Sequence, residues 1–156
     1  MYSEYDSFLE QVRYPLRLGC LDLSGWPVVV SLWYIWENGQ LYCATQANAR
    51  VVGYLEKNPS CGFEISNQSP PYCGVRGRAV AQILPERGPE ILEKLLDRYL
   101  MGKDDRLVAR LKKNIDQEVA VCLVPQQMTS WNFSKRMAKI TLPFDQNDIC
   151  PPNTAD

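Results

Sequence analysis

The segment 27–36 constrains the fold more than any other part of the chain. Its residues alternate with the period of a β-strand, and both of the faces that this creates are apolar. One face carries Val28, Val30, Leu32, Tyr34 and Trp36, and the other carries Val29, Ser31, Trp33 and Ile35. A strand that is apolar on both faces needs cover on both sides. We expect one face to line the interior of a barrel and the other to lie under a helix or a second subunit.

Turn residues and alternation predict further strands around this one. Glu37-Asn38-Gly39 is typical of a tight hairpin, because Asn-Gly supplies the positive φ angles, so 40–45 should return antiparallel. Other strands are expected at 16–23, 60–65, 72–84 and 118–125, with a further extended stretch at 128–137. The strand 72–84 places Arg76 and Arg78 side by side on one face.

Helices are expected between the strands. A first short helix follows Ser3 or Ser7, and 49–57 has helical spacing and stops before Pro59. Gly88-Pro89-Glu90 begins a third helix, which ends near Gly102, and Asp104 or Asp105 caps a fourth. This order lacks a βαβ rhythm, so it predicts a mainly β protein, an antiparallel Greek-key barrel with flanking helices, in one domain.

The chain contains no histidine among its 156 residues. This excludes Ser-His-Asp and Cys-His nucleophile pairs, HExxH zinc sites and histidine-ligated haem. The formal net charge of −1 argues against nucleic acid as a partner. Neither a G-x-G-x-x-G motif after a strand nor a P-loop motif occurs in the sequence.

The six cysteines stand at positions 20, 43, 61, 73, 122 and 150, and none of them forms a CxxC motif. We expect them to be reduced and to act as small core residues. The acidic N-terminal segment lacks the features of a secretory signal, and the longest apolar run, 28–36, is too short to span a bilayer. The prediction is therefore a cytoplasmic protein without membrane association.

From the first strand onward, the chain resembles the pyridoxamine 5'-phosphate oxidase-like, FMN-binding split β-barrel family. The resemblance covers 16–137 in the family's order. It is carried by GCLDLSGWPVVVSLWYIWENGQLYCATQ, ARVVGYLEKNP, PPYCGVRGRA, ERGPEILEKLLDRYL and VPQQMTSWNFSKRM. It implies a homodimer with flavin mononucleotide (FMN) at the subunit interface, one FMN-binding domain over 1–143, and a loose C-terminal tail over 144–156.

The resemblance also implies a set of cofactor-binding residues. Val30, Ser31, Leu32 and Trp33 would line the isoalloxazine, while Thr45, Gln46 and Arg50 would hold the ribityl phosphate; Arg76 and Arg78 would lie close to the partner's flavin, and Trp131 would approach the flavin from the other subunit. A polar loop before a helix beginning near Ala49 agrees with this, because a helix N-terminus favours a phosphate. For the tryptophans, ordinary packing is the alternative; for Arg76 and Arg78, it is a solvated strand face paired with Glu64 or Glu86.

Two departures from the family pattern narrow the expected function. Where family members that bind FMN firmly carry serine, arginine and lysine, this chain has Ala49, Arg50 and Val51. The cofactor is therefore expected to be FMN or, alternatively, a deazaflavin. The segment 135–137 also lacks the histidine of true pyridoxamine phosphate oxidases. We expect an FMN-dependent oxidoreductase with a small-molecule substrate that is not such an oxidase; the alternatives are a deazaflavin-dependent reductase and a non-catalytic, dimeric flavin-binding module.

Overall fold

The computed structural model describes residues 3–137 and 149–154. The strands of this part of the chain are β1 (Leu16–Leu21), β2 (Pro27–Leu32), β3 (Ile35–Glu37), β4 (Gln40–Gln46), β5 (Ser60–Ser66), β6 (Cys73–Leu84) and β7 (Glu118–Asn132). Its helices are α1 (Asp6–Gln11), α2 (Arg50–Lys57), α3 (Gly88–Leu100), α4 (Asp105–Lys112) and α5 (Ser134–Met137), with 3₁₀ turns at Pro85–Arg87 and Ile115–Gln117.

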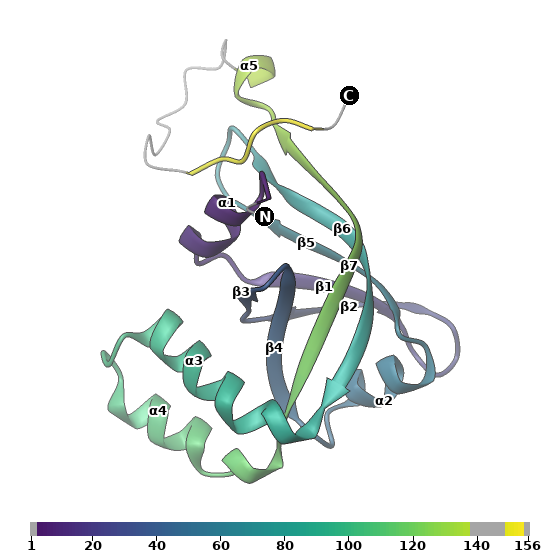
Figure 1. The fold of residues 1–156 in the computed structure, drawn as a ribbon, viewed down its shortest axis with the longest axis vertical. Coiled ribbons are helices and arrows are strands. Elements are labelled where there is room, and N and C mark those ends of the chain that lie inside the picture. The colour runs from purple at the N-terminus through teal and green to yellow at the C-terminus, as the bar shows by residue number, and fades with distance from the viewer. Residues whose placement is uncertain (1–2, 138–148, 155–156) are drawn as a thin grey trace.

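The strands form one antiparallel sheet in the order β2-β1-β5-β6-β7-β4-β3. The two longest strands, β6 and β7, run together through its middle, and the sheet curls around the apolar interior (Figure 1). The helix α3 lies beside β4, with α4 next to α3 on the side away from the sheet, and α2 packs near β6 and β1 (Figure 1). The expectation of a mainly β, antiparallel split barrel with flanking helices is confirmed.

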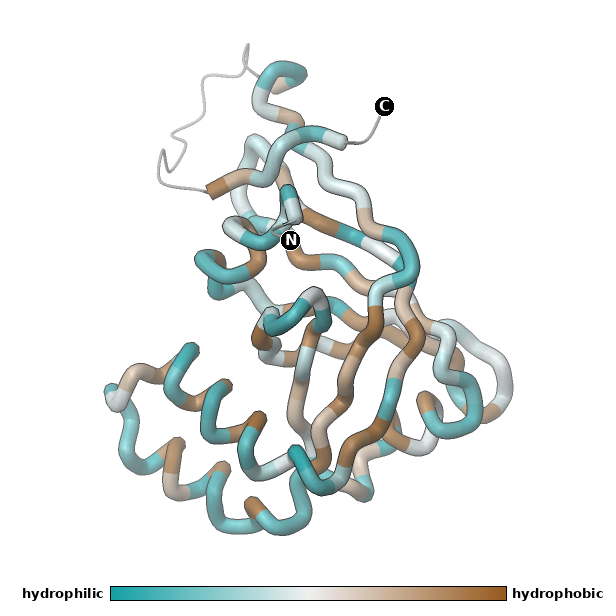
Figure 2. Tube along the Cα trace, viewed as in Figure 1, coloured by the Kyte–Doolittle hydropathy of each residue, from teal (hydrophilic) through white to brown (hydrophobic). Residues whose placement is uncertain are grey.

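Two apolar cores hold these layers together. The larger core fills the sheet's interior and includes Leu16, Leu18, Leu41, Ile65 and Val121, all fully buried. The smaller one joins α3 to β4 and β7 through Ile91, Leu95, Tyr42, Ala120 and Cys122. In Figure 2 the apolar residues gather along the crossing strands, while polar residues cover much of α3 and α4. The helical spacing of the α3 leucines is what directs one face of that helix to the sheet.

Local signals in the sequence were accurate at several turns and caps. Asn38 and Gly39 have φ angles of 52° and 76°, as a tight β3–β4 hairpin requires. Asp104 caps α4, because its side chain accepts a hydrogen bond of 2.9 Å from the main-chain N–H of Leu107. Gly102, with a φ angle of 71°, follows the end of α3 as expected.

The expected strand 27–36 is broken in the structure. It divides into β2 and β3, with Trp33 and Tyr34 between them. Tyr34 turns fully into the interior, where its hydroxyl donates to the Leu9 carbonyl at 2.9 Å and its main-chain N–H to the Tyr99 hydroxyl at 3.3 Å. The outer face of β2 is open in the single chain, since Val29 is 69% exposed.

The expected separate stretch at 128–137 is also corrected. β7 continues without interruption to Asn132, because it pairs with β6 along the whole length of that strand, and α5 follows. A register shift between Arg78 and Ala79 absorbs the irregularity near Pro125, whose nitrogen carries no hydrogen to donate to the ladder.

The expectation that all six cysteines are reduced is wrong for one pair. Cys73 and Cys150 form a disulfide, although 77 positions separate them in the sequence. Their side chains meet because residues 149–154 lie against the sheet, where the Thr154 hydroxyl accepts a hydrogen bond of 2.7 Å from the Ser130 main-chain N–H. This part of the expected loose tail is therefore fixed to β7, and 138–148 lie outside the described residues.

The other four cysteines, Cys20, Cys43, Cys61 and Cys122, are buried free thiols, as expected for core residues. Burial raises the pKa of each thiol above its ordinary value, for Cys61 to about 11. Because the thiolate is the reactive form of cysteine, these side chains are unreactive packing groups.

Candidate functional site

A cavity of about 440 Å³ lies where the ends of β2 and β4 and the start of β7 face α3 and α4. It is lined by Ser31, Leu32, Trp33, Ala44, Thr45, Gln46, Leu92, Leu95, Leu107, Leu111 and Glu118. Five of the ten expected cofactor-binding residues are therefore together in one cavity. Its volume is within the range of small-molecule sites in proteins, about 300–1,000 Å³.

The walls of this cavity are mostly apolar. Two leucines of α3 and two of α4 point into it at helical spacing. Trp33 forms part of the wall and stacks on Tyr99 of α3, with ring centroids 4.9 Å apart and planes 6° apart. Tyr99 thus fixes the orientation of the indole, which gives the cavity a flat aromatic side.

A polar pair occupies one end of the cavity. Gln46 of β4 and Glu118 of β7 are cross-strand partners, and the Gln46 amide Nε2 donates to the Glu118 carboxylate. The same nitrogen donates to the Asn114 carbonyl at 3.5 Å. Glu118 is only 8% exposed, and burial raises the pKa of its carboxyl group above the ordinary value.

Sequence reasoning missed Glu118. Its signal was a single charged residue at the start of the otherwise apolar run 119–124, where a solvated strand end is the simpler interpretation. The structure buries it because α3 packs over the beginning of β7.

A second hollow of about 430 Å³ lies at the N-terminus of α2 and includes Arg50. No side chain caps this helix, so the main-chain N–H groups of its first turn lack that kind of partner. The main-chain N–H of Ala49 donates to the Gln46 carbonyl at 2.9 Å, and this turn connects the hollow to the polar end of the cavity. Arg50 is exposed there, and Glu56 lines the same hollow.

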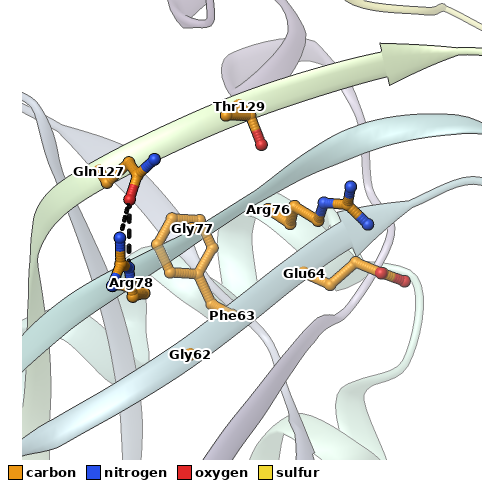
Figure 3. A pocket seen from close by; sticks show the side chains of 8 residues that line it. All are labelled: Gly62, Phe63, Glu64, Arg76, Gly77, Arg78, Gln127 and Thr129. Carbon is orange, nitrogen blue, oxygen red and sulfur yellow. Dashed lines mark hydrogen bonds between the residues drawn. The ribbon is translucent and has the colours of Figure 1, made fainter. Parts of the chain in front are cut away.

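Arg76 and Arg78 lie in a third hollow, of about 340 Å³, on the outer face of β5, β6 and β7. Figure 3 shows both side chains on one side of the sheet, with Arg78 hydrogen-bonded to Gln127. The Nε of Arg78 donates to Gln127 Oε1 at 3.1 Å. The Arg76 guanidinium lies 5.2 Å from the centroid of the Trp131 ring. Trp131 itself is 7% exposed, so its ring is largely covered.

The structure thus divides the expected site residues into groups. Ser31, Leu32, Trp33, Thr45 and Gln46 share the cavity, and Arg50 occupies the adjoining hollow. Val30 packs against the larger core instead of lining the cavity. Arg76, Arg78 and Trp131 form their own cluster and do not line the cavity of their own chain.

The described residues contain neither a cluster of metal-ligating side chains nor a membrane-spanning helix. No group of three or more Cys, Asp or Glu side chains in 3–137 and 149–154 is arranged to hold a metal ion. Within the same ranges, none of the helices has both the length and the apolar character needed to cross a membrane.

No family model and no curated protein matches this chain. Solved structures do match it over most of its length. A conserved hypothetical protein from Mycobacterium tuberculosis is 20% identical, with a TM-score of 0.74 and coverage of 95% of this chain and 96% of that chain. An F420 reductase is 21% identical, with a TM-score of 0.68 and coverage of 83% and 98%.

A Listeria innocua protein named after pyridoxamine 5'-phosphate oxidase is 17% identical, with a TM-score of 0.61 and coverage of 80% of this chain and 92% of that chain. Together with the antiparallel sheet and its flanking helices, these similarities define the class: the chain is a split β-barrel. More specifically, its fold is that of the pyridoxamine 5'-phosphate oxidase-like proteins.

Proposed function

We propose that this chain binds a flavin, FMN or a deazaflavin, and serves as a flavin-dependent oxidoreductase that is not a true pyridoxamine phosphate oxidase. The observation that carries the proposal is the cavity beside α3, which gathers five expected cofactor-binding residues next to the hollow of Arg50. The names of two structural neighbours, an F420 reductase and a protein named after pyridoxamine 5'-phosphate oxidase, support cofactors of this class.

The residues fit such a cofactor in two parts. The apolar cavity, with its aromatic side at Trp33, suits a flat hydrophobic ring system. The uncapped start of α2 and the guanidinium of Arg50 suit a phosphate. When bound, a flavin supplies the hydride chemistry, so the protein needs no histidine.

In this proposal the chain's own residues position the ring and exclude water. The leucines of α3 and α4 close the cavity on the helix side, and Tyr99 holds the Trp33 indole in place. Among the described residues that line the hollow at the N-terminus of α2, Arg50 is the one cationic side chain, and we assign the phosphate to this hollow. The neighbouring position cannot add a second charge there, because Val51 packs in the larger core and is 7% exposed.

A second copy of the chain is part of the proposal. The outer face of β2 and the turn before it leave large apolar side chains uncovered, with Val29 69% and Trp26 73% exposed. A homodimer formed through this face would cover them. It would also allow Arg76 and Arg78 of one copy to approach the cavity of the other, with the Trp131 ring held beneath the Arg76 guanidinium.

The test is the ligand itself. We expect the purified protein to carry, or to take up, one flavin per subunit, seen in the absorption spectrum and in the mass of the molecule released on heating. The bound flavin should be reducible by a nicotinamide donor or by a reduced deazaflavin. A colourless protein that takes up neither FMN nor a deazaflavin would contradict the proposal.

A non-catalytic flavin-binding module is the second candidate. The observation that favours it is the single cation in the phosphate hollow, since loss of one charge-assisted contact weakens binding by about tenfold to a hundredfold. If the protein binds one flavin per subunit and neither a nicotinamide donor nor a reduced deazaflavin reduces it, this candidate is favoured over the enzyme.

A further inference from the structure

We propose that Gln46 and Glu118 accept hydrogen bonds from the hydroxyl groups of the ribityl chain, which links the flavin ring to its phosphate, and that Gln46 does not hold the phosphate. This inference rests on the proposed function, because it names what one end of the flavin cavity recognises. Four observations of the structure carry it.

The first observation is the orientation of the Gln46 amide. Its Nε2 faces two acceptors, the Glu118 carboxylate and the Asn114 carbonyl, and this fixes which end of the amide is nitrogen. An amide nitrogen has two hydrogens, and both are used in these contacts. The remaining group of Gln46 is its Oε1, which accepts hydrogen bonds. A phosphate at neutral pH is itself an acceptor, so Oε1 cannot bind it.

The second observation is the charge at this end of the cavity. Glu118 is the only ionisable side chain among the described residues that line the cavity, and neither a lysine nor an arginine is present there. A phosphate placed beside the Glu118 carboxylate would be repelled, while an O–H donor would be attracted. The ligand group at this position is therefore a donor.

The third observation is the incomplete pairing of Glu118. Gln46 is its one side-chain partner in the described part of the chain, and this contact uses Oε1. A buried carboxylate is costly unless its oxygens receive hydrogen bonds. A hydroxyl group donating to the second oxygen would meet this requirement, and hydrogen bonds to charged acceptors are among the stronger ones.

The fourth observation is the location of the pair between two hollows. Gln46 lines the cavity with its side chain, and its main-chain carbonyl accepts from Ala49, which lines the hollow of Arg50. A ligand with its ring between Trp33 and the α3 leucines and its phosphate at Arg50 must pass this point. In FMN the group between ring and phosphate is the ribityl chain, which offers O–H donors.

Three probes separate the contributions of ring, ribityl chain and phosphate: lumiflavin has only the ring, riboflavin adds the ribityl chain, and FMN adds the phosphate. The test is to measure, by flavin fluorescence, the dissociation constants of the three probes for the full chain and for Glu118→Gln. An amide oxygen is a weaker acceptor than a carboxylate, so riboflavin and FMN should both bind about three- to tenfold more weakly to this variant. Lumiflavin should change less than about twofold. The matched control is Glu86→Gln, at an exposed carboxylate outside the cavity lining, which should leave all three constants unchanged.

The outcomes distinguish the two proposals. If the unmodified chain binds none of the three probes, the proposed flavin function fails and this inference fails with it. If the chain binds flavins but Glu118→Gln weakens lumiflavin as much as riboflavin, weakens FMN alone, or changes nothing, the ribityl assignment is overturned while flavin binding stands. Gln46→Leu is a second variant that removes the acceptor at Oε1, and the same selective loss of riboflavin and FMN is expected. It decides the question if Glu118→Gln does not fold.

Discussion

Gly88 and Glu118 approach each other so closely that no side chain fits between them. A Cβ atom on Gly88 would lie 1.9 Å from the main-chain oxygen of Glu118. The first residue of α3 therefore rests directly on the first residue of β7. Because α3 carries Leu92 and Leu95 into the cavity, this contact sets how far the helix stands from the polar pair at the cavity's end.

Replacing Gly88 with alanine should destabilise the protein. The backbone of β7 cannot yield easily, so the start of α3 must move, and overpacking of this kind costs about 1–3 kcal/mol. Urea denaturation followed by circular dichroism measures the loss. Gly53→Ala is the matched control: it lies inside α2, where a Cβ meets no atom within 4 Å, and alanine should stabilise it by about 0.5–1 kcal/mol. A Gly88→Ala variant as stable as the unmodified chain would show that α3 can shift freely.

Arg50→Ala should weaken FMN binding by about tenfold to a hundredfold, because it removes the charge-assisted contact with the phosphate. Riboflavin, which lacks the phosphate, should bind with unchanged affinity. Isothermal titration with both ligands gives the comparison. Arg110→Ala, at an exposed position on α4, serves as the control for loss of one positive charge. Equal affinity of FMN for Arg50→Ala and the unmodified chain would move the phosphate site elsewhere, with Arg76 and Arg78 as the next residues to change.

Cys150→Ser should lower the free energy of unfolding by about 2–4 kcal/mol, since the disulfide to Cys73 closes a long loop and constrains the unfolded chain. In the variant, residues 149–154 should also detach more readily from β7, so proteolysis should remove this segment sooner. Dithiothreitol provides the control: it should lower the urea midpoint of the unmodified chain and leave that of Cys150→Ser unchanged. An unmodified chain insensitive to the reductant would contradict the role assigned to this bond.

The elements that local chemistry determines were predictable from the sequence. Asn38-Gly39 predicts a tight turn because these residues readily adopt positive φ angles, and Asp104 predicts a helix cap because its side chain can accept a main-chain hydrogen bond. The alternation of residues in 72–84 predicts a strand. The neighbourhood of Ser31, Trp33 and Gln46 was accessible only through the family resemblance. These residues come from different strands, and no spacing in the sequence brings them together.

Features that depend on tertiary packing were not predictable. Cys73 and Cys150 stand 77 positions apart in the sequence, and only the path of the segment 149–154 explains their pairing. Val30 is an apolar residue within an apolar run, so the sequence does not show whether its side chain packs against the core or lines the cavity. This depends on where β2 ends in the fold. Glu118 could not be recognised as a site residue because the sequence does not show that α3 covers it.

Burial of Glu118 predicts how stability depends on pH. The pKa of its carboxyl group lies above the ordinary value of 4.5 because burial disfavours the charged form, an effect that the Gln46 hydrogen bond only partly offsets. Between pH 4.5 and the raised pKa, the folded chain keeps a proton that the unfolded chain has lost. The contribution of this group to stability is therefore fully present below pH 4.5 and is lost as the pH rises through the raised pKa.

Glu118→Gln should abolish this dependence, since an amide does not titrate. The difference in unfolding free energy between Glu118→Gln and the unmodified chain should thus move in favour of the variant as the pH rises above 4.5, and then become constant. Urea denaturation at a series of pH values measures it, with Glu86→Gln as the control for loss of one exposed carboxylate. The pKa of Glu37 is lowered mainly by its hydrogen bond with Lys94, so this group stabilises the fold less as the pH falls below 4.5. Glu37 is present in both proteins, so its contribution cancels in the difference. A difference that is flat across this range would mean that Glu118 titrates alike in the folded and unfolded chains, and that the carboxylate at the cavity's end is solvated rather than buried.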